Sequence, residues 1–305
     1  MRHARGIRRI AATIGNAVSG MSSATEMTAA PTSAQTHMPH AGLAQLIDVD
    51  ELSGADVVVR MLGPFELTIR DVEVEQWASH KGLAVLKYLL MSAPRQVRRE
   101  TLMDLFWPGY RPASARNNLN VAIYGLRRSL EAAADHLSLI LYRDGCYALN
   151  PNLSWWNDLE RFRERLATAD AAAERGDQRA AMNSYLTAVG LYRGPLFEDD
   201  TRSEWHLDEQ RFLQDLYLGA SEALANMYLD AGEVAGAVAA GQEVLRTDPC
   251  RESTHRLLMR CFALQNQRQL VARQFRRCAE VLERELGLPP AGETLRLYRE
   301  LTGLT

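Results

Sequence analysis

The segment ARNNLNVAIYGLRRSL spans residues 115–130 and has the pattern of a helix with one apolar side. At about 100° per residue, its apolar side chains fall together; they are Leu119, Ala122, Ile123, Leu126 and Leu130. The opposite side carries Asn117, Asn120, Val121, Tyr124 and Arg128, with Arg116 and Arg127 on its flank. Taken alone, the pattern fits an ordinary surface helix with a solvated polar face. It also fits a helix that reads DNA, because asparagine can pair with adenine and arginine can pair with guanine or bind phosphate.

The sequence on either side of this helix indicates a winged helix-turn-helix domain. Short β-rich runs upstream predict a small antiparallel sheet; they are residues 57–61, 65–69 and 72–74. Two helices follow, over residues 81–91 and 99–106, and each ends near a proline. Downstream, two alternating runs flank Asp144-Gly145, which favours a hairpin because type I′ turns need positive φ. The order of sheet, three helices and hairpin predicts an α+β winged helix-turn-helix with an N-terminal antiparallel sheet.

Several of these residues resemble known bacterial regulators. Residues 119–130 are similar to the VDVxIxxLRRKL pattern of OmpR-like regulators, and RDGCYAL at 143–149 fits their closing hairpin. More widely, Val59–Leu301 resembles the bacterial transcriptional activator domain (BTAD) family, which includes the SARP-type regulators of antibiotic gene clusters. The resemblance implies an activator that binds direct repeats in promoters, forms a homodimer on DNA and recruits RNA polymerase. One departure is Arg98, which stands where related proteins often place Ser or Thr ahead of the second helix.

The second half of the chain predicts helical repeats. The turn Asp230–Glu233 aligns with Leu264–Gln267 at a spacing of 34 residues, the tetratricopeptide period. Gly176 precedes Gly232 by 56 residues, which is one period plus an insertion of 22. Helix pairs of this kind stack into an array because none can bury its faces alone. We expect an all-α tetratricopeptide-like domain, with a plain helical bundle as the alternative.

The expected organisation has three parts, with boundaries at residues 55 and 150. Residues 1–55 are read as a disordered N-terminal extension or an over-extended start, because they lack periodicity. A secretory signal is the rival interpretation, although the apolar run that follows the first arginines is interrupted by polar residues. Residues 56–150 form the winged domain, and residues 151–305 form the tetratricopeptide-like activator domain. Trp155 and Trp156 are expected to pack in a core or between domains.

The expected DNA contacts divide into base-reading and backbone-holding residues. Helical geometry predicts base contacts from the N-terminal part of the recognition helix; the candidates are Asn117, Asn120, Val121 and Tyr124. The candidates for the phosphate backbone are Arg98, Arg99, Arg116, Arg127, Arg128 and Arg143. Arg143 lies at the tip of the hairpin, and Arg98 and Arg99 open the second helix. For these last two, simple solvated charge is an equally good interpretation.

The distribution of charge is compatible with DNA binding. The whole chain has a net charge of -3, which by itself favours no polyanion as a partner. Residues 57–150, however, carry 12 basic and 9 acidic groups, whereas residues 151–305 carry 19 and 24. Between Arg95 and Arg128 there are 7 arginines and only two acidic residues. A local basic patch beside an acidic domain permits nucleic-acid binding without proving it.

Motifs for catalysis and metal binding are missing from the sequence. It contains no GxxxxGK[ST], GxSxG or HExxH, and its four cysteines form no CxxC pair. We therefore expect no catalytic residues, no metal and no cofactor, and idle thiols in a reducing compartment. The acidic run Glu198-Asp199-Asp200 is read as a solvated loop rather than a metal site.

No apolar run approaches the length of a membrane helix, so the expected location is the cytoplasm. Double-stranded DNA is the expected partner. Two alternatives remain open: a tetratricopeptide scaffold whose winged domain no longer reads DNA, and a regulator that senses a ligand on the concave face of the repeats.

Overall fold

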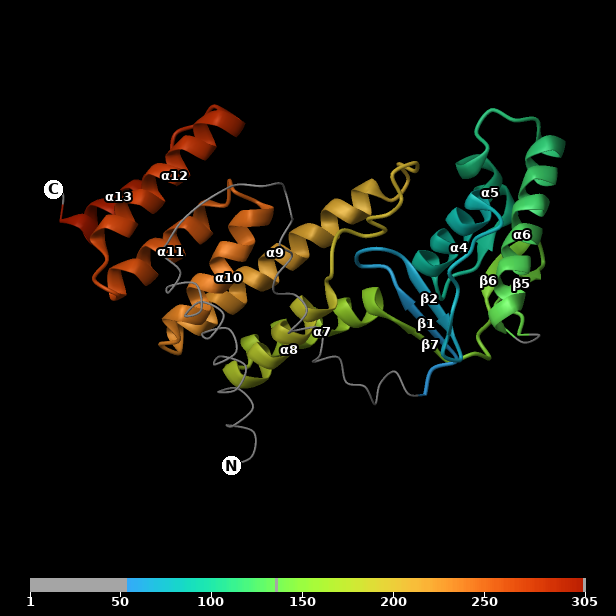
Figure 1. Ribbon diagram of the computed structural model, residues 1–305, viewed down its shortest axis with the longest axis horizontal. Coiled ribbons are helices and arrows are strands. Elements are labelled where there is room, and N and C mark those ends of the chain that lie inside the picture. The colour runs from blue at the N-terminus through green and yellow to red at the C-terminus, as the bar shows by residue number, and fades with distance from the viewer. Residues whose placement is uncertain (1–53, 135–136, 304–305) are drawn as a thin grey trace, which may run out of the picture. The chain divides into compact units, whose positions relative to one another are not determined.

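The computed structural model describes residues 54–134 and 137–303 (Figure 1). The expectation for residues 1–55 therefore falls almost entirely outside the described residues. The described chain forms two compact units. The first contains residues 54–162 and 190–213, and we call it the winged unit. The second contains residues 163–189 and 214–303, and we call it the helical unit.

The winged unit begins with a four-stranded sheet. Its strands are β1 (Val57–Arg60), β2 (Glu66–Ile69), β3 (Val72–Glu73) and β7 (Trp155–Asn157), in the order β3-β2-β1-β7. The three strands expected from the sequence are present, and their pairing is antiparallel as predicted. The fourth strand, β7, was not predicted, and it pairs parallel to β1. Trp156 on this strand is buried, which agrees with its expected packing role.

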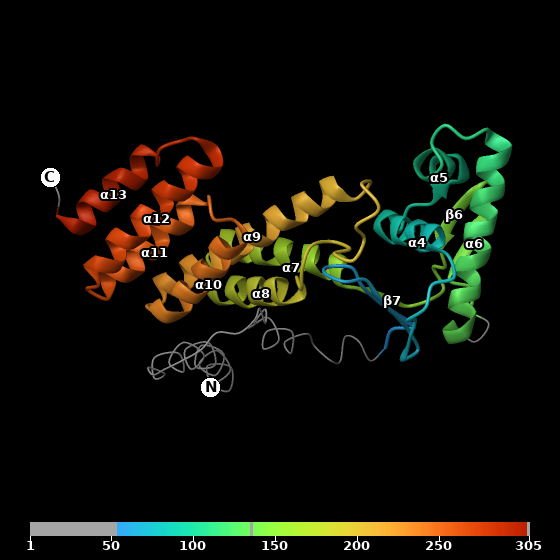
Figure 2. The same cartoon turned by 45° about the horizontal axis from the view of Figure 1, so that its top comes forward.

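Three helices and a second sheet complete the winged helix-turn-helix (Figures 1 and 2). The helices are α4 (His80–Ser92), α5 (Arg99–Phe106) and α6 (Pro112–Ala134). The second sheet has the order β4-β6-β5, from β4 (Val97–Arg98), β5 (Ile140–Arg143) and β6 (Cys146–Leu149). Asp144 and Gly145 have φ of 49° and 79°, which is the geometry expected for the hairpin turn.

Helix α6 is longer than the predicted 115–130. It begins with Pro112, a residue that suits the first helical position because its fixed φ is helical and its missing N–H is not needed there. It continues to Ala134 because Glu131 and the alanines after it favour helix. The predicted apolar side is confirmed, since Leu119, Ala122, Ile123, Leu126 and Leu130 are all buried.

Glycines set the close packing of α4 against α6. A Cβ added to Gly82 would lie 2.5 Å from the backbone oxygen of Ala122, and one added to Gly125 would lie 2.9 Å from Cβ of Ser79. Ser79 caps α4, because its Oγ accepts a hydrogen bond from the Gly82 N–H at 2.9 Å. The two helices therefore meet backbone to backbone at this point.

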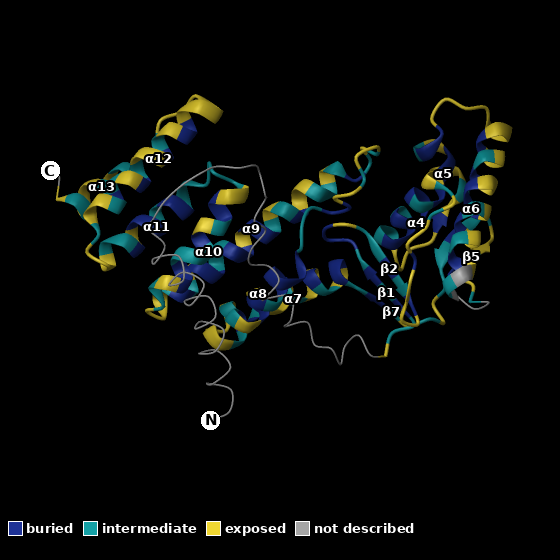
Figure 3. Ribbon diagram, viewed as in Figure 1, coloured by how far each residue is buried: buried dark blue, intermediate teal, exposed yellow. Residues whose placement is uncertain are grey.

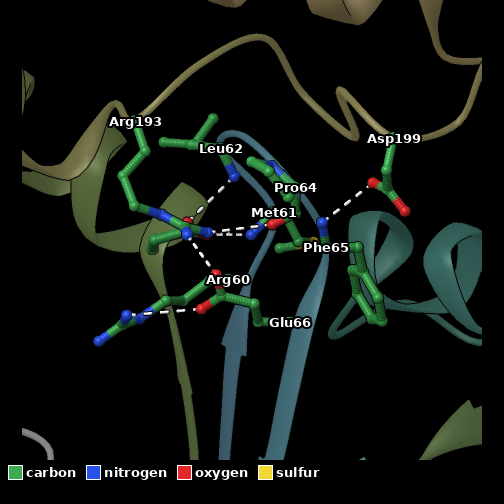
Figure 4. Close-up of polar contacts among 9 residues, drawn as sticks. Arg60, Met61, Leu62, Pro64, Phe65, Glu66, Arg193 and Asp199 are labelled. Atoms are coloured by element: carbon green, nitrogen blue, oxygen red, sulfur yellow. Dashed lines mark hydrogen bonds and ion pairs between the residues drawn. The ribbon is translucent and has the colours of Figure 1, made fainter. Parts of the chain in front are cut away.

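Residues 190–213 run from the end of one helix of the repeat array, through a loop, into the start of the next, yet they belong to the winged unit. Their backbone pairs with the β1–β2 turn: the Gly63 N–H donates to the Pro195 oxygen, Phe197 donates to Met61, and Glu198 donates to Gly63. Side chains reinforce this contact (Figure 4). Arg193 Nη1 lies 2.6 Å from Glu66 Oε1, and Asp199 Oδ1 accepts a hydrogen bond from the Phe65 N–H at 2.9 Å.

The loop Glu198-Asp199-Asp200 is exposed at Glu198 and Asp199, as expected, but two of its carboxylates also pair with a buried cation. Asp199 and Asp200 each place a carboxylate oxygen within 4 Å of the buried Lys87 ammonium, at 3.5 and 3.7 Å. The sequence could not indicate this pairing, because Lys87 is more than 110 positions away in the chain.

The helical unit is built from helix–turn–helix pairs. Its helices, three of which extend into the winged unit, are α7 (Asp158–Glu174), α8 (Gln178–Leu191), α9 (Leu207–Asp230), α10 (Val234–Thr247), α11 (Glu252–Leu264), α12 (Arg268–Leu286) and α13 (Gly292–Thr302). The same turn closes the pairs α7–α8, α9–α10 and α11–α12, with left-handed residues at Gly176, Gly232 and Asn266. The last two turns are 34 residues apart, as the repeat prediction required.

Candidate nucleic-acid interface

The predicted base-reading residues lie together on the exposed face of α6. Asn117 and Asn120 are exposed, and Val121 and Tyr124 have 62% and 70% of their surface accessible. Figure 3 shows exposed and buried positions alternating along this helix, as a two-faced helix requires. Val121 and Tyr124 are one helical turn apart, so their exposed side chains form a small contiguous apolar patch, which is typical of binding surfaces. The buried face, which packs on α4, fixes which way these four side chains point.

The arginines on α6 take up two different positions. Arg116 and Arg128 are exposed, on the same helix as the four base-reading candidates. Arg127 is also exposed, but its Nη2 donates a hydrogen bond to the Ile140 carbonyl oxygen at 3.4 Å. Arg127 therefore ties the helix to the start of β5, whereas Arg116 and Arg128 are directed at solvent.

The two arginines that open α5 differ in the same way. Arg98 is exposed and occupies the N-cap position, with no hydrogen bond from its side chain to the helix. Arg99 forms a salt bridge with Glu100 at 3.0 Å, and its Nη1 donates to the Tyr142 hydroxyl at 3.1 Å. Its backbone N–H donates to the Gly145 oxygen, so Arg99 joins α5 to the hairpin.

The ionisable groups around the start of α5 and the hairpin shift the pKa values of two of their members, Glu100 and Tyr147. The pKa of Glu100 is lowered, first by a hydrogen bond from its own backbone N–H and then by Arg99. Arg116 on α6, which packs against α5, lowers the pKa of the same carboxylate further. Burial raises the pKa of Tyr147, whose ring lies 4.6 Å from that of Tyr142 on the neighbouring strand.

The hairpin adds a residue that the sequence analysis missed. Arg143 is exposed beside the Asp144-Gly145 turn, as expected for a wing that approaches DNA. Tyr142, which precedes it, has 42% of its surface accessible and contacts Arg99. Its position next to Arg143, at the exposed end of β5 beside the Asp144-Gly145 turn, was the signal that could have identified it.

The described residues give no support for a metal site or a membrane-spanning helix. No group of three or more His, Cys, Asp and Glu residues there is placed to hold a metal ion. Within the same residues, no helix combines the length and the apolar character needed to cross a bilayer.

Comparison with known proteins matches both halves of the chain. Residues 75–148 match the family described as transcriptional regulatory protein, C terminal, and residues 157–302 match the bacterial transcriptional activator domain. The chain is 26% identical over 246 residues to the transcriptional regulatory protein MoaR1 of Mycobacterium tuberculosis, covering 80% of this chain and 79% of MoaR1. MoaR1 of Mycobacterium bovis matches to the same extent.

Among solved structures, the chain resembles Mycobacterium tuberculosis EmbR, which was solved in complex with a low affinity phosphopeptide. The TM-score is 0.68 at 22% identity, and the match covers 81% of this chain but only 65% of the EmbR chain. At this identity the likeness establishes a shared fold.

Proposed function

Because the chain belongs to the SARP-type regulators, which join an OmpR-like winged helix to a bacterial transcriptional activator domain, we propose that it is a sequence-specific DNA-binding activator. In this proposal α6 lies in the major groove of promoter DNA, and the β5–β6 hairpin contacts the neighbouring backbone or minor groove. The chain performs no catalytic step. It acts by binding.

The observation that best supports this proposal is the exposed face of α6. It combines amide, aromatic and apolar groups with flanking arginines on the third helix of a winged fold. In our assignment, Asn117 and Asn120 pair with base edges, while Val121 and Tyr124 make apolar contacts in the groove. Arg98, Arg116, Arg128 and Arg143 hold phosphates.

Two of the predicted backbone contacts are proposed with a modified role. Arg99 and Arg127 are already engaged with Tyr142 and Ile140. We propose that they orient the hairpin against α5 and α6, and that any phosphate contact they make is secondary. Arg99 also forms a salt bridge with Glu100, whose negative charge reduces the attraction of the guanidinium for a polyanion.

The test is selection of binding sequences from a random duplex library by the purified full chain, followed by footprinting on the upstream region of its own gene. Asn120→Ala should alter preference at one base pair, costing about 1–3 kcal/mol for the correct base. Arg128→Ala should weaken all sequences alike and reduce the salt dependence of binding by about one phosphate contact.

Matched controls come from the helical unit. Asn226 on α9 and Arg273 on α12 are exposed residues of the same types, and their alanine variants should bind DNA like the parent chain. If no sequence is enriched and no region is protected, the DNA-reading proposal is wrong. A scaffold role for the winged domain would then be the better explanation.

The proposal also covers the assembly of the chain on DNA and the activation of transcription. We propose that the chain binds direct repeats as a dimer and recruits RNA polymerase. Its footprint should then contain two similar half-sites separated by about one helical turn of 10–10.5 base pairs, or a multiple of it. Transcription with purified polymerase from such a template should rise when the chain is added, and a template with one scrambled half-site should lose the response.

A further inference from the structure

The segment between α8 and α9 explains an irregularity in the repeat array. The turns at Gly176 and Gly232 are 56 residues apart, 22 more than the 34 that separate Gly232 from Asn266. Residues 190–213 are nearly the same length as this excess, and they are the part of the sequence between those turns that belongs to the winged unit. We call residues 190–213 the docked insertion.

Lys87 is the central residue of the contact between α4 and the docked insertion. It is only 1% exposed, although lysine is almost never fully buried without a partner. Its Nζ lies 3.5 Å from Asp199 Oδ2 and 3.7 Å from Asp200 Oδ2. The same atom lies 4.8 Å from the ring centre of Phe197 and 5.2 Å from that of Phe65. Lys87 is one of only two lysines among the 35 basic residues of this chain, and its ammonium is enclosed by two carboxylates and two rings.

Aromatic residues extend the contact to the second helix of the winged fold. The Trp205 ring lies 5.4 Å from that of Tyr88 on α4 and 6.0 Å from that of Phe106 at the end of α5. The docked insertion therefore contacts both helices that precede α6. Because α4 and α6 meet without space for a methyl group at Gly82, a shift of α4 toward α6 displaces α6 as well.

The docked arrangement also contains unfavourable features. Trp205 Nε1 and His206 Nδ1 are buried without a hydrogen-bond partner in the described structure. Unpaired buried polar atoms favour a state in which water reaches them. The contact between the docked insertion and α4 thus depends on Asp199 and Asp200, whose charges compensate that of Lys87.

We infer that Lys87 is a positioning residue for DNA recognition: through Asp199 and Asp200 it keeps the docked insertion seated on α4 and α5, and so holds α6 in its DNA-reading position. This inference rests on the proposed DNA binding. In this inference, a segment that lies within the match to the bacterial transcriptional activator domain, residues 157–302, positions α6 of the winged domain. If the insertion leaves its seat, the DNA-competent state becomes less populated and the apparent affinity falls in proportion.

The experiment uses the full chain and the double variant Asp199→Asn/Asp200→Asn. Asparagine keeps the oxygen that accepts from the Phe65 N–H, but leaves the Lys87 ammonium without a carboxylate. The control, Asp215→Asn/Asp230→Asn, removes two charges from exposed positions of α9 that lie outside the docked insertion. The triple variant Lys87→Met/Asp199→Asn/Asp200→Asn removes the uncompensated charge and retains an apolar side chain for the cage.

Two readouts are measured at a temperature where every variant is folded: hydrogen exchange of residues 197–206, and affinity for the selected DNA. We expect the double variant to exchange at least about tenfold faster in this segment and to bind DNA at least about tenfold more weakly. Loss of two negative charges alone should strengthen DNA binding, so the control should bind as well as the parent or slightly better. The triple variant should recover most of both losses.

Unchanged DNA affinity in the double variant would overturn the inference, even if its melting temperature falls, because the contact would then only stabilise the fold. Failure of the triple variant to recover would overturn it too, since the effect would not act through Lys87. If the parent chain binds no DNA but residues 197–206 exchange as expected, the seating by Lys87 holds and the proposed function fails.

Discussion

The exposed face of α6 and the surroundings of Lys87 are both made of polar, charged and aromatic side chains, but they are organised in opposite ways. On α6, Asn117, Asn120 and Arg128 extend into solvent on a single helix. Around Lys87, the two carboxylates and two rings come from segments far apart in the sequence and enclose one ammonium group. The first surface is complete only with a partner molecule, whereas the second is completed by the chain itself. Changes at the second should therefore cost stability, and changes at the first should cost binding alone.

The largest stability effect should come from the double variant Asp199→Asn/Asp200→Asn. Removing the partners of a buried charge costs about 3–5 kcal/mol, because the remaining charge is left uncompensated. Urea unfolding followed by far-ultraviolet circular dichroism measures this loss. Adding Lys87→Met should return most of it, since an apolar side chain in the same cage needs no counter-charge. A loss below that of an ordinary surface substitution would show that water already reaches Lys87.

Asp158 should make the stability of the winged unit depend on pH. Its carboxylate accepts hydrogen bonds from the Met61 and Leu62 N–H groups at 2.7 and 3.0 Å, and burial raises its pKa to about 6 from 3.8. Because the folded state holds this proton more tightly than the unfolded chain, its contribution is complete below about pH 4 and is lost as pH rises through about 6. The loss amounts to roughly 3 kcal/mol.

Unfolding of the parent chain and of Asp158→Asn across pH 4 to 7 tests this prediction. The variant lacks the titrating group, so the stability difference between the two proteins should be larger at pH 4 than at pH 7. A difference that is constant over this range would contradict the raised pKa. Like Lys87, Asp158 is a buried ionisable group of the winged unit. Its hydrogen bonds, however, come from the backbone N–H groups of Met61 and Leu62.

Gly82→Ala should cost about 1–3 kcal/mol, because the new methyl group would meet the Ala122 backbone oxygen at 2.5 Å and push α4 from α6. Gly219→Ala is the matched control. Gly219 lies within α9, and nothing is within 4 Å of the position its Cβ would take. There the same substitution should stabilise the protein by about 0.5–1 kcal/mol, because alanine is the better helix former. Equal effects at both sites would contradict the close approach at Gly82.

The smallest stability effect should be that of Asn120→Ala. An exposed side chain whose partner is expected outside the chain should change the free energy of unfolding by less than about 0.5 kcal/mol. Thermal unfolding of this variant beside Asn226→Ala gives the measurement. If Asn120→Ala also loses base preference, the substitution affects binding and not stability, in contrast to the changes around Lys87. A large loss of stability would mean that Asn120 has a structural role.

The difference between these regions also explains what the sequence could predict. The α6 face is periodic and local, so helical spacing was enough to place its buried and exposed residues. The hairpin turn and the 34-residue spacing of the repeat turns are local too, and the structure has both. The bases that α6 would read are not encoded in any such spacing, and the assignment of individual contacts remains a proposal.

What the sequence could not predict depends on pairing between distant segments. Strand β7 joins β1 across almost a hundred residues, and Lys87 meets Asp199 and Asp200 across more than a hundred. The excess of 22 residues in the repeat spacing was visible as an insertion, but nothing in its composition showed where it would pack. A buried lysine in an arginine-rich chain was the one available signal.

The path of the chain limits how this regulator can be divided or recombined. The backbone leaves the winged unit after residue 162, re-enters it at 190 and leaves again after 213. A hybrid regulator that transplants only residues 56–150 would therefore lack part of the unit it means to transfer. Under the proposed function, DNA specificity should be easier to exchange by replacing surface residues of α6 than by exchanging residues 56–150, because α6 packs on α4 and α4 contacts residues 190–213.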